Sequence, residues 1–463
     1  MKRREFLRNS ICAALGGAGL YSALGNLRLL EAATRAYGPT AFSDYKAMVC
    51  VFMFGGNDAM NMVIPRDATH YGQYSAARAT LAVPQSSLLP LTPQAGGGAS
   101  DGADYALQAS TNAEETIGMG GLQSLFNDGK AAIVGNVGTL VRPVTKAEFQ
   151  NGTAALPPQL FSHNDQQSYW QVSRSDDGRN LGWGGRIADL LHDANPGAFI
   201  PMTVSLNFES GLERSANGNQ YVVGNDGPRY FNWFEWDGDR RTAYLKLNSE
   251  IQAHAFERSY AASFHRAREN ASAVGAALES STPLTTAFPD SELGRQLKMV
   301  ARLIKVRAEL GLKRQIYFVS MGGFDHHDGL LSGQPVLLAR LSRAVKAFYD
   351  ATVELGIANN VATFTASDFG RTLSSNGDGS DHGWGGHHFI VGGGVRGGRF
   401  YGTMPKLQNG GSDDAGWGQI IPTTSVDQYA ATLARWFGVA DTDLDLIFPN
   451  LGNFGSRNLG FMA

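Results

Sequence analysis

Short apolar runs of strand length recur along the chain, and each one ends abruptly in Gly, Asn, Asp or Ser. The runs cover residues 46–54, 131–134, 315–320, 361–366 and 388–391. A continuous apolar run of this length is typical of a strand that is buried on both faces, as in a parallel sheet with helices on either side. The pattern therefore predicts a parallel sheet.

Stretches with a helical stripe of apolar residues lie between these runs, at 293–310, 335–355 and 426–437. The alternation predicts one doubly wound α/β domain over residues 37–463, with a mostly parallel sheet and helices on both faces. In such sheets ligands bind beyond the carboxyl ends of the strands. The loops that carry Asp and His fall at those ends.

Two segments depart from the alternation: residues 91–104, which we interpret as a flexible surface loop, and residues 207–245. Residues 207–245 are aromatic and polar, and we interpret them as an insertion beside the sheet. Their aromatic residues include Tyr221, Tyr230, Phe231, Trp233, Phe234 and Trp236. A locally packed cap and a surface that binds carbohydrate or peptide are both consistent with this composition.

The first residues have the features of an export signal. Lys2-Arg3-Arg4-Glu5-Phe6-Leu7-Arg8 precedes a weakly apolar, Gly/Ala-rich stretch that glycines interrupt, unlike a membrane anchor. We predict a twin-arginine signal peptide over residues 1–36 and export of the folded protein by the twin-arginine machinery to the periplasm or beyond. An uncleaved amphipathic start is the alternative. The mature chain has no other long apolar stretch and is not expected to span a membrane.

Composition excludes several classes of protein. The net charge of −3 arises without a long run of either sign, which gives no reason to expect nucleic-acid binding. Only two cysteines occur, Cys12 and Cys50, so a disulfide scaffold and a Cys-based zinc cluster are excluded. Glycine makes up 57 of 463 residues, about 12% against a usual value of roughly 7%. Much of it lies where the predicted strands end.

Histidines and carboxylates gather in two of these loops. His326 and His327 lie in Gly322-Gly-Phe-Asp-His-His-Asp328, and three more histidines lie in Asp381-His-Gly-Trp-Gly-Gly-His-His388. Imidazole and carboxylate at one sheet edge suit a divalent metal such as Zn or Mn. In an extended segment Asp325 and His327 point the same way, so both could bind one ion. A Gly-rich turn with solvent-exposed histidines is the alternative.

Other polar residues follow strands or begin helices. Asp58 closes Gly55-Gly-Asn-Asp58 after the first strand, although this motif alone indicates only a turn. Ser162 precedes Asp165 by three residues, which fits a helix N-cap and also fits a nucleophile activated by a metal ion. Asp368 ends another strand, and Arg371 could hold a tetrahedral anion or pair with a neighbouring acid.

Taken in order, these motifs resemble the DUF1501 family of exported bacterial proteins over nearly all of the mature chain. They are Gly55-Gly-Asn-Asp58, Phe161-Ser-His-Asn-Asp165, Gly323-Phe-Asp-His-His327, Ser367-Asp-Phe-Gly-Arg-Thr372, Asp381-His-Gly383 and Gly392-Gly-Gly-Val-Arg-Gly-Gly398. The resemblance implies an alkaline phosphatase/sulfatase-like fold. It also implies two metal ions at the strand ends, with a Ser or Thr nucleophile between them.

The resemblance further implies roles for individual residues. Ser162 becomes the candidate nucleophile. One metal site would contain Asp325, His327 and His382, and Asp58 and Asp368 would contribute to the other. The sequence departs from the superfamily pattern at Phe369, where a histidine is usual. The second site therefore lacks a ligand unless His163, His387 or His388 replaces it.

The leading hypothesis is an exported metal-dependent hydrolase of phosphate or sulfate esters. Metal-activated Ser162 would attack phosphorus or sulfur, and Arg371 would steady the nonbridging oxygens. The cofactor would be one or two divalent ions (Zn, Mn, Mg or Ca), and the substrate a small-molecule or glycan ester. The rival hypothesis is a non-catalytic periplasmic or surface protein that binds a ligand on a degenerate phosphatase-like scaffold. A metal-dependent phosphomutase is a third reading, less consistent with export because its substrates are mainly cytoplasmic.

Overall fold

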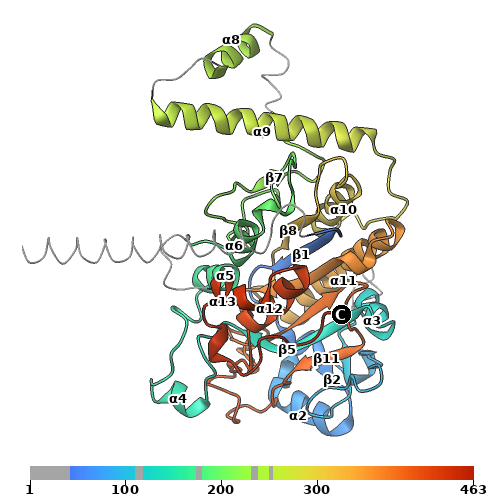
Figure 1. Cartoon of the computed structure of the whole chain (residues 1–463). Helices are drawn as coiled ribbons and strands as arrows, with labels where there is room; N and C mark the ends of the chain where they lie inside the picture. Colours follow the sequence, from blue (N-terminus) through green and yellow to red (C-terminus); the bar gives the residue numbers. More distant parts are fainter. Residues whose placement is uncertain (1–41, 110–117, 174–179, 231–237, 250–253) are drawn as a thin grey trace, which may run out of the picture.

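The computed structural model describes residues 42–463 apart from 110–117, 174–179, 231–237 and 250–253 (Figure 1). The predicted signal peptide, residues 1–36, lies outside the described residues, as do Phe231, Trp233, Phe234 and Trp236 of the aromatic segment. Among the residues described, no helix is both long enough and apolar enough to cross a membrane.

Within the described residues, the centre of the protein is a nine-stranded sheet in the order β11-β5-β10-β9-β1-β8-β6-β7, with β12 also paired to β5. In the described part of the chain, all of its strand pairings are parallel except the two made by β10, so the predicted mostly parallel sheet is confirmed. In chain order the strands are β1 (Lys46–Met53), β5 (Ala131–Gly138), β6 (Thr203–Leu206), β7 (Tyr221–Val223), β8 (Arg314–Met321), β9 (Val361–Ser367), β10 (Gly386–Val391), β11 (Arg399–Gly402) and β12 (Thr424–Ser425).

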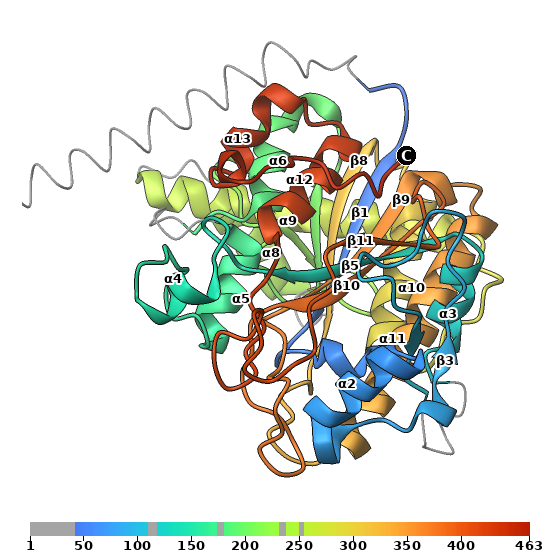
Figure 2. The same ribbon diagram turned by 90° about the horizontal axis from the view of Figure 1, so that it is seen from below.

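Helices cover both faces of this sheet, as predicted (Figure 2). Alternate residues of β1 show why. Val49 and Val51 are buried against one set of helices, whereas Cys50 and Phe52 are buried against the other. The first set is α3 (Gly120–Asn127), α10 (Glu292–Lys305) and α11 (Leu330–Glu354); the second is α5 (His163–Val172), α6 (Trp183–Leu190), α12 (Val426–Phe437) and α13 (Leu444–Ile447).

The remaining elements surround this core. A small sheet pairs β2 (Val63–Pro65) and β3 (Leu89–Pro90) with β4 (Tyr105–Leu107), next to α2 (Ala68–Arg78). Helix α4 (Lys146–Gln150) is short. Helices α8 (Gly238–Ser249) and α9 (Ala255–Ser280) lie at one end of the molecule, with α8 outside α9 (Figure 1). The predicted insertion contributes β7, the edge strand of the main sheet, and the start of α8.

Element boundaries follow the sequence pattern in α12 and depart from it in α11. The apolar stripe placed the start of α11 at Pro335, a residue favoured at helix starts. The helix instead begins at Leu330, after the left-handed Gly329, and contains Pro335. Leu330, Gln334 and Pro335 are all buried, so packing holds the extra turn despite the backbone hydrogen bond that proline cannot donate.

The fold brings three strand ends together. Strand β1 pairs in parallel with both β8 and β9, so the loops that follow these three strands lie at one edge of the sheet. Glycine lets the β1 loop pass close to the other two. Gly55 has φ +115°, and a Cβ there would lie 2.5 Å from the backbone nitrogen of Asp325. Gly56 has φ +82°, and a Cβ there would lie 2.5 Å from the ring of Phe369.

Candidate metal centre

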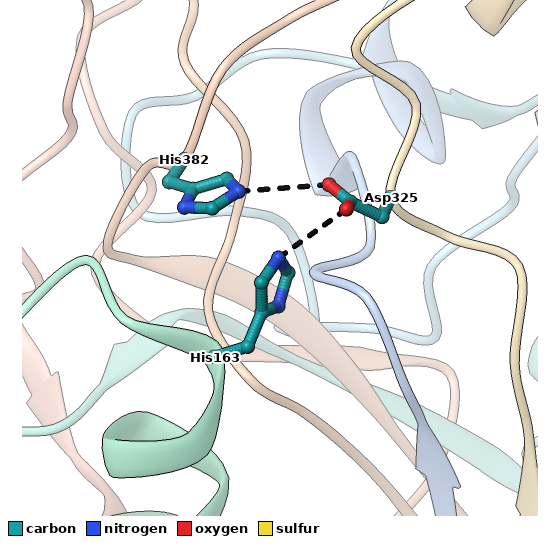
Figure 3. A group of neighbouring side chains, drawn as sticks. All are labelled: His163, Asp325 and His382. Atoms are coloured by element: carbon teal, nitrogen blue, oxygen red, sulfur yellow. Dashed lines mark ion pairs between the residues drawn. The ribbon is translucent and has the colours of Figure 1, made fainter.

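Asp325 is the hub of a cluster of histidines beyond the carboxyl end of β8. Its Oδ1 atom lies 3.1 Å from Nε2 of His327 and 3.6 Å from Nε2 of His382. Its Oδ2 atom lies 3.4 Å from Nε2 of His163. Figure 3 shows the imidazoles of His163 and His382 directed at the two oxygens of this carboxylate. Four ligand-type side chains from three segments of the chain therefore converge.

The same three histidines are held from behind through their other nitrogen. Nδ1 of His163 lies 2.6 Å from Oδ2 of Asp368, and Nδ1 of His382 lies 2.7 Å from the carbonyl oxygen of Phe161. Nδ1 of His327 lies 3.0 Å from Oδ1 of Asp381. A carbonyl can only accept and an ionised carboxylate only accepts, so each Nδ1 carries the hydrogen. In the neutral rings every Nε2 lone pair is then free and faces the centre, as in metal-binding histidines.

The free nitrogens fit a cation. Nε2 of His327 and Nε2 of His382 are 3.0 Å apart, and Nε2 of His163 is buried without a hydrogen-bond partner among the described residues. Two unprotonated nitrogens at this separation repel each other unless a proton or a metal ion lies between them. His163, Asp325 and His382 offer ligand atoms that all lie within 4.8 Å of one another. Three imidazoles and a carboxylate are a donor set that suits zinc and related ions.

Local electrostatics keep these groups in their metal-binding forms. Burial opposes ionisation of Asp325, but the hydrogen bond and charge of Arg371 outweigh it and hold the pKa of Asp325 below its ordinary value. Burial lowers the pKa of His382 and so favours the neutral ring. Hydrogen bonding from Asn376 is the largest of the contributions that lower the pKa of Asp381. The carboxylates are thus ionised and His382 is neutral near pH 7.

Arg371 lies behind Asp325 and not in open solvent. It is 1% exposed, and its Nη1 donates to Oδ1 of Asp325 at 2.7 Å and to the carbonyl of Gly55 at 3.3 Å. Its Nη2 donates to the carbonyl of Ser380. Of the two roles considered for Arg371, the geometry shows pairing with a neighbouring acid.

Three of the residues assigned to metal sites meet in this cluster: Asp325, His327 and His382. Asp368 contacts it through His163. Its buried Oδ2 also accepts hydrogen bonds from the backbone of Gly55 at 3.2 Å and from Nε2 of Gln167 at 2.8 Å.

Asp58 has different partners. Its carboxylate is fully buried, forms an ion pair with Arg78 and accepts a hydrogen bond from the backbone of Asn61 at 3.2 Å. The contributions of Asp58 and Asp368 to a second metal site stay predictions.

Ser162 occupies the N-cap position of α5, directly before His163. Its hydroxyl donates to Oδ2 of Asp165 at 2.6 Å and makes no capping bond to the helix backbone. The backbone on either side is tied to the cluster, because the carbonyl of Phe161 contacts His382 and the side chain of His163 faces Asp325. Ser162 is therefore placed at the border of the cluster with a carboxylate beside its hydroxyl.

From the sequence, His163 was one of three histidines that could replace the metal ligand missing at Phe369. The signal for it is its spacing from Gln167, four residues later on the same face of α5, since both side chains reach Oδ2 of Asp368. The other two substitutes lie in β10, where burial lowers the pKa of His387 to about 4 and that of His388 to about 3. Both rings belong to the core, so His163 is the histidine that joins the cluster.

Phe369 lies against the two outer imidazoles. The ring is 3% exposed, and its centroid is 4.9 Å from that of His163 and 4.8 Å from that of His382. An apolar side chain thus packs against the cluster at the position where the resemblance led us to expect histidine.

Comparison with known proteins gives one family match. The sequence model of a family described as "Protein of unknown function (DUF1501)" matches residues 45–433. No curated protein matches the chain.

Solved structures with similar folds include a protein of the alkaline phosphatase superfamily from Vibrio parahaemolyticus, with 10% identity, coverage of 90% of this chain and 75% of that one, and a TM-score of 0.37. A lipoteichoic acid synthase from Listeria monocytogenes has 8% identity, coverage of 92% and 81%, and a TM-score of 0.36. A sulfatase from Pseudoalteromonas sp. has 10% identity, coverage of 86% and 68%, and a TM-score of 0.33.

Proposed function

The chain belongs to the DUF1501 family, and we propose that it is an exported metal-dependent hydrolase of phosphate or sulfate esters. Its metal centre would be formed by His163, Asp325, His327 and His382. The observation that carries the proposal is the convergence of three Nε2 atoms on one carboxylate, each ring being held through Nδ1 by an acceptor. The twin-arginine signal predicted from the sequence supports export.

A divalent ion bound here would act as a Lewis acid that polarises an ester oxygen. The residues of the chain supply the positioning. Asp368, itself held by a hydrogen bond from Gln167, fixes His163; Asp381 fixes His327, and the buried guanidinium of Arg371 fixes Asp325. We therefore assign to Arg371 the orientation of the carboxylate, since its Nη atoms are already used by Asp325, Gly55 and Ser380.

Ser162 is the proposed nucleophile. Its Oγ would form a bond to the phosphorus or sulfur of the ester, and its proton would pass to Oδ2 of Asp165 at 2.6 Å. The leaving oxygen would depart with the electron pair of the broken P–O or S–O bond and take up a proton from water. A water oxygen would then bond to the phosphorus or sulfur and give a proton to solvent, the bond to Oγ of Ser162 would break, and Oγ would take back the proton held by Asp165, which frees the phosphate or sulfate. The hydrogen bond between Ser162 and Asp165 supports this assignment because a base within reach of the hydroxyl is what a serine nucleophile requires.

One ion is proposed in place of two. The carboxylate of Asp58 is used by Arg78, and Oδ2 of Asp368 by three donors. Phe369 supplies no ligand.

The test combines metal analysis with turnover of the purified, exported chain. We expect stoichiometric metal by mass spectrometry and hydrolysis of p-nitrophenyl phosphate or p-nitrophenyl sulfate. Asp325→Asn and His163→Gln should lose both properties, whereas Ser162→Ala should keep the metal and lose turnover. His192→Gln is the matched control, because His192 is a surface histidine paired only with Asp193 among the ion pairs of the described residues. Wild-type protein that binds no more metal than Asp325→Asn would refute the proposal.

The packing of Phe369 favours a second candidate, a non-catalytic binding protein that retains the metal centre. The apolar ring of Phe369 lies beside two ligand histidines, so this position offers no ligand for the second metal ion of a two-metal hydrolase. The same experiment separates the two functions. If the wild-type protein binds metal but hydrolyses neither ester, and Ser162→Ala binds the same amount of metal, the result would support the non-catalytic binding protein.

A further inference from the structure

Trp417 is a large apolar side chain displayed in water. It is 88% exposed, and its backbone has φ +59°, a left-handed conformation that is costly for a residue with a bulky side chain. Glycines lie on both sides of it, at 416 and 418. Glycine would adopt the backbone conformation of residue 417 with less strain, yet the sequence has tryptophan there. Strained residues persist when the surroundings hold them and often mark functional sites.

The turn that carries Trp417 is held rigidly. Oδ1 of Asp414, a buried residue, accepts hydrogen bonds from the backbone of Gly416 at 2.8 Å and of Gly418 at 2.9 Å. Backbone hydrogen bonds join Ala415 to Gln419 at 2.9 Å and Gln419 to Gly416 at 3.0 Å. The indole is therefore presented from a fixed backbone.

This turn is attached directly to the metal centre. Nε2 of Gln419 donates to the carbonyl of His382 at 3.2 Å, and the backbone of Leu373 donates to the carbonyl of Gly418 at 2.7 Å. Leu373 follows Arg371 by two residues. Trp417 thus lies in a loop that borders the segment 371–382, which carries one ligand histidine and the arginine behind Asp325.

The surroundings of Trp417 are polar. Among the described residues, no other exposed large apolar side chain lies within 370–425. Polar side chains from a distant segment reach the same loop: Nε2 of Gln150 donates to the carbonyl of Ala415 at 3.5 Å, and Nζ of Lys146 donates to the carbonyls of Gly410 and Gly411 at 2.8 and 2.9 Å. A protein or membrane partner would need a wider apolar patch than one ring. A single flat apolar surface with a polar border matches a ligand that has one apolar face and hydroxyl groups at its edge, which is a sugar ring.

We propose that Trp417 is a stacking platform for a sugar ring, and that the ligand of this loop cluster is a glycan. That the glycan is also the ester substrate rests on the proposed hydrolase function. Binding of a glycan to Trp417 does not require that the protein hydrolyse an ester.

Binding of the full chain to a printed array of neutral and sulfated oligosaccharides tests the proposal. Trp417→Gly should weaken binding of the wild-type ligands by about two- to tenfold, the order of magnitude of one aromatic contact. Trp417→Phe should retain part of it. Phe256→Ala is the matched control, since Phe256 is an aromatic residue on α9 that is 81% exposed, and its loss should leave binding unchanged.

Two further measurements keep the outcome interpretable. Trp417→Gly should unfold at the same temperature as wild type or higher, because glycine relieves the left-handed strain; a lower unfolding temperature would indicate a structural role and overturn the proposal. An array on which no saccharide is bound in a Trp417-dependent way would also overturn it. Trp417-dependent binding by protein that holds no metal would leave this inference standing while refuting the proposed hydrolase.

Discussion

Nε2 of His327 and Nε2 of His382 face each other across 3.0 Å, and neither ring can turn away without breaking the hydrogen bond of its Nδ1. The two residues come from loops 55 positions apart in the chain. Without a proton or a cation between them, their lone pairs repel. The pair therefore favours the binding of a positive charge between the two rings.

Removal of metal should destabilise the protein. A ligand that binds only the folded state stabilises it by about 2.7 kcal/mol when its free concentration is roughly a hundred times its Kd. We expect a chelator to lower the Tm of wild-type protein and added zinc or manganese to restore it. Calorimetry with and without chelator measures this. Asp325→Asn should show no chelator effect, and an equal effect in both proteins would contradict a metal at this centre.

Asp381 should control the affinity for metal without controlling the fold. Its carboxylate accepts from Nδ1 of His327 at 3.0 Å, and its side chain is 58% exposed. Loss of a carboxylate behind a ligand histidine typically lowers metal affinity by about ten- to a hundredfold. Asp381→Ala should show this loss in a competition titration with a fluorescent chelator. Asp378→Ala is the control, because Asp378 lies in the same loop and accepts from the backbone of Gly329 instead.

Asp58 and Arg78 should behave as a structural pair. Both side chains are fully buried, and Arg78 also donates to the carbonyls of Thr372 at 2.8 Å and Leu373 at 3.2 Å, which anchors the segment after Arg371. Removal of one partner leaves a buried charge uncompensated, so Arg78→Met should lower the free energy of unfolding by about 3–5 kcal/mol. Urea denaturation measures it. A double variant with Asp58→Asn should recover part of the loss; strictly additive losses would show that the two side chains do not interact.

Stability should fall as pH rises through the titration of Asp427. Burial raises the pKa of this carboxyl from its ordinary 3.8 to about 7, against the opposing hydrogen bond from Ser173. The folded state then binds more protons than the unfolded state between these values. The resulting stability is complete below the unfolded pKa and is lost as pH rises to the folded pKa.

We expect the free energy of unfolding of wild-type protein to drop by about 3 kcal/mol more between pH 5 and pH 8 than that of Asp427→Asn. Denaturation curves at both pH values give the difference. Asp445→Asn serves as the control, since Asp445 is a surface residue paired with Arg457. A wild-type curve that parallels Asp427→Asn would show that Asp427 is ionised in the fold.

The sequence was informative wherever burial depends on local spacing. The apolar runs at 46–54, 315–320 and 361–366 predicted β1, β8 and β9, and the helical stripe at 426–437 predicted the bounds of α12. The direction of β10 was not visible, because a strand buried on both faces has the same apolar run whether it is parallel or antiparallel. The pairing of Asp325 with His327 and His382 could be proposed because all three follow strand ends.

Other features needed the tertiary structure, because a side chain's partner depends on which loops meet in space. Nothing local distinguishes Asp58, which is paired with Arg78, from Asp325, which faces the histidines. His163 enters the cluster only because α5 packs beside the end of β9. There Asp368, 205 residues farther along the chain, accepts the hydrogen bond from Nδ1 of His163. By itself the sequence determined the sheet, the edge of the sheet at which the candidate metal ligands lie, and the residue types available there. The packing of distant loops decided which of those residues face one another, since that choice rests on long-range contacts that no periodicity encodes.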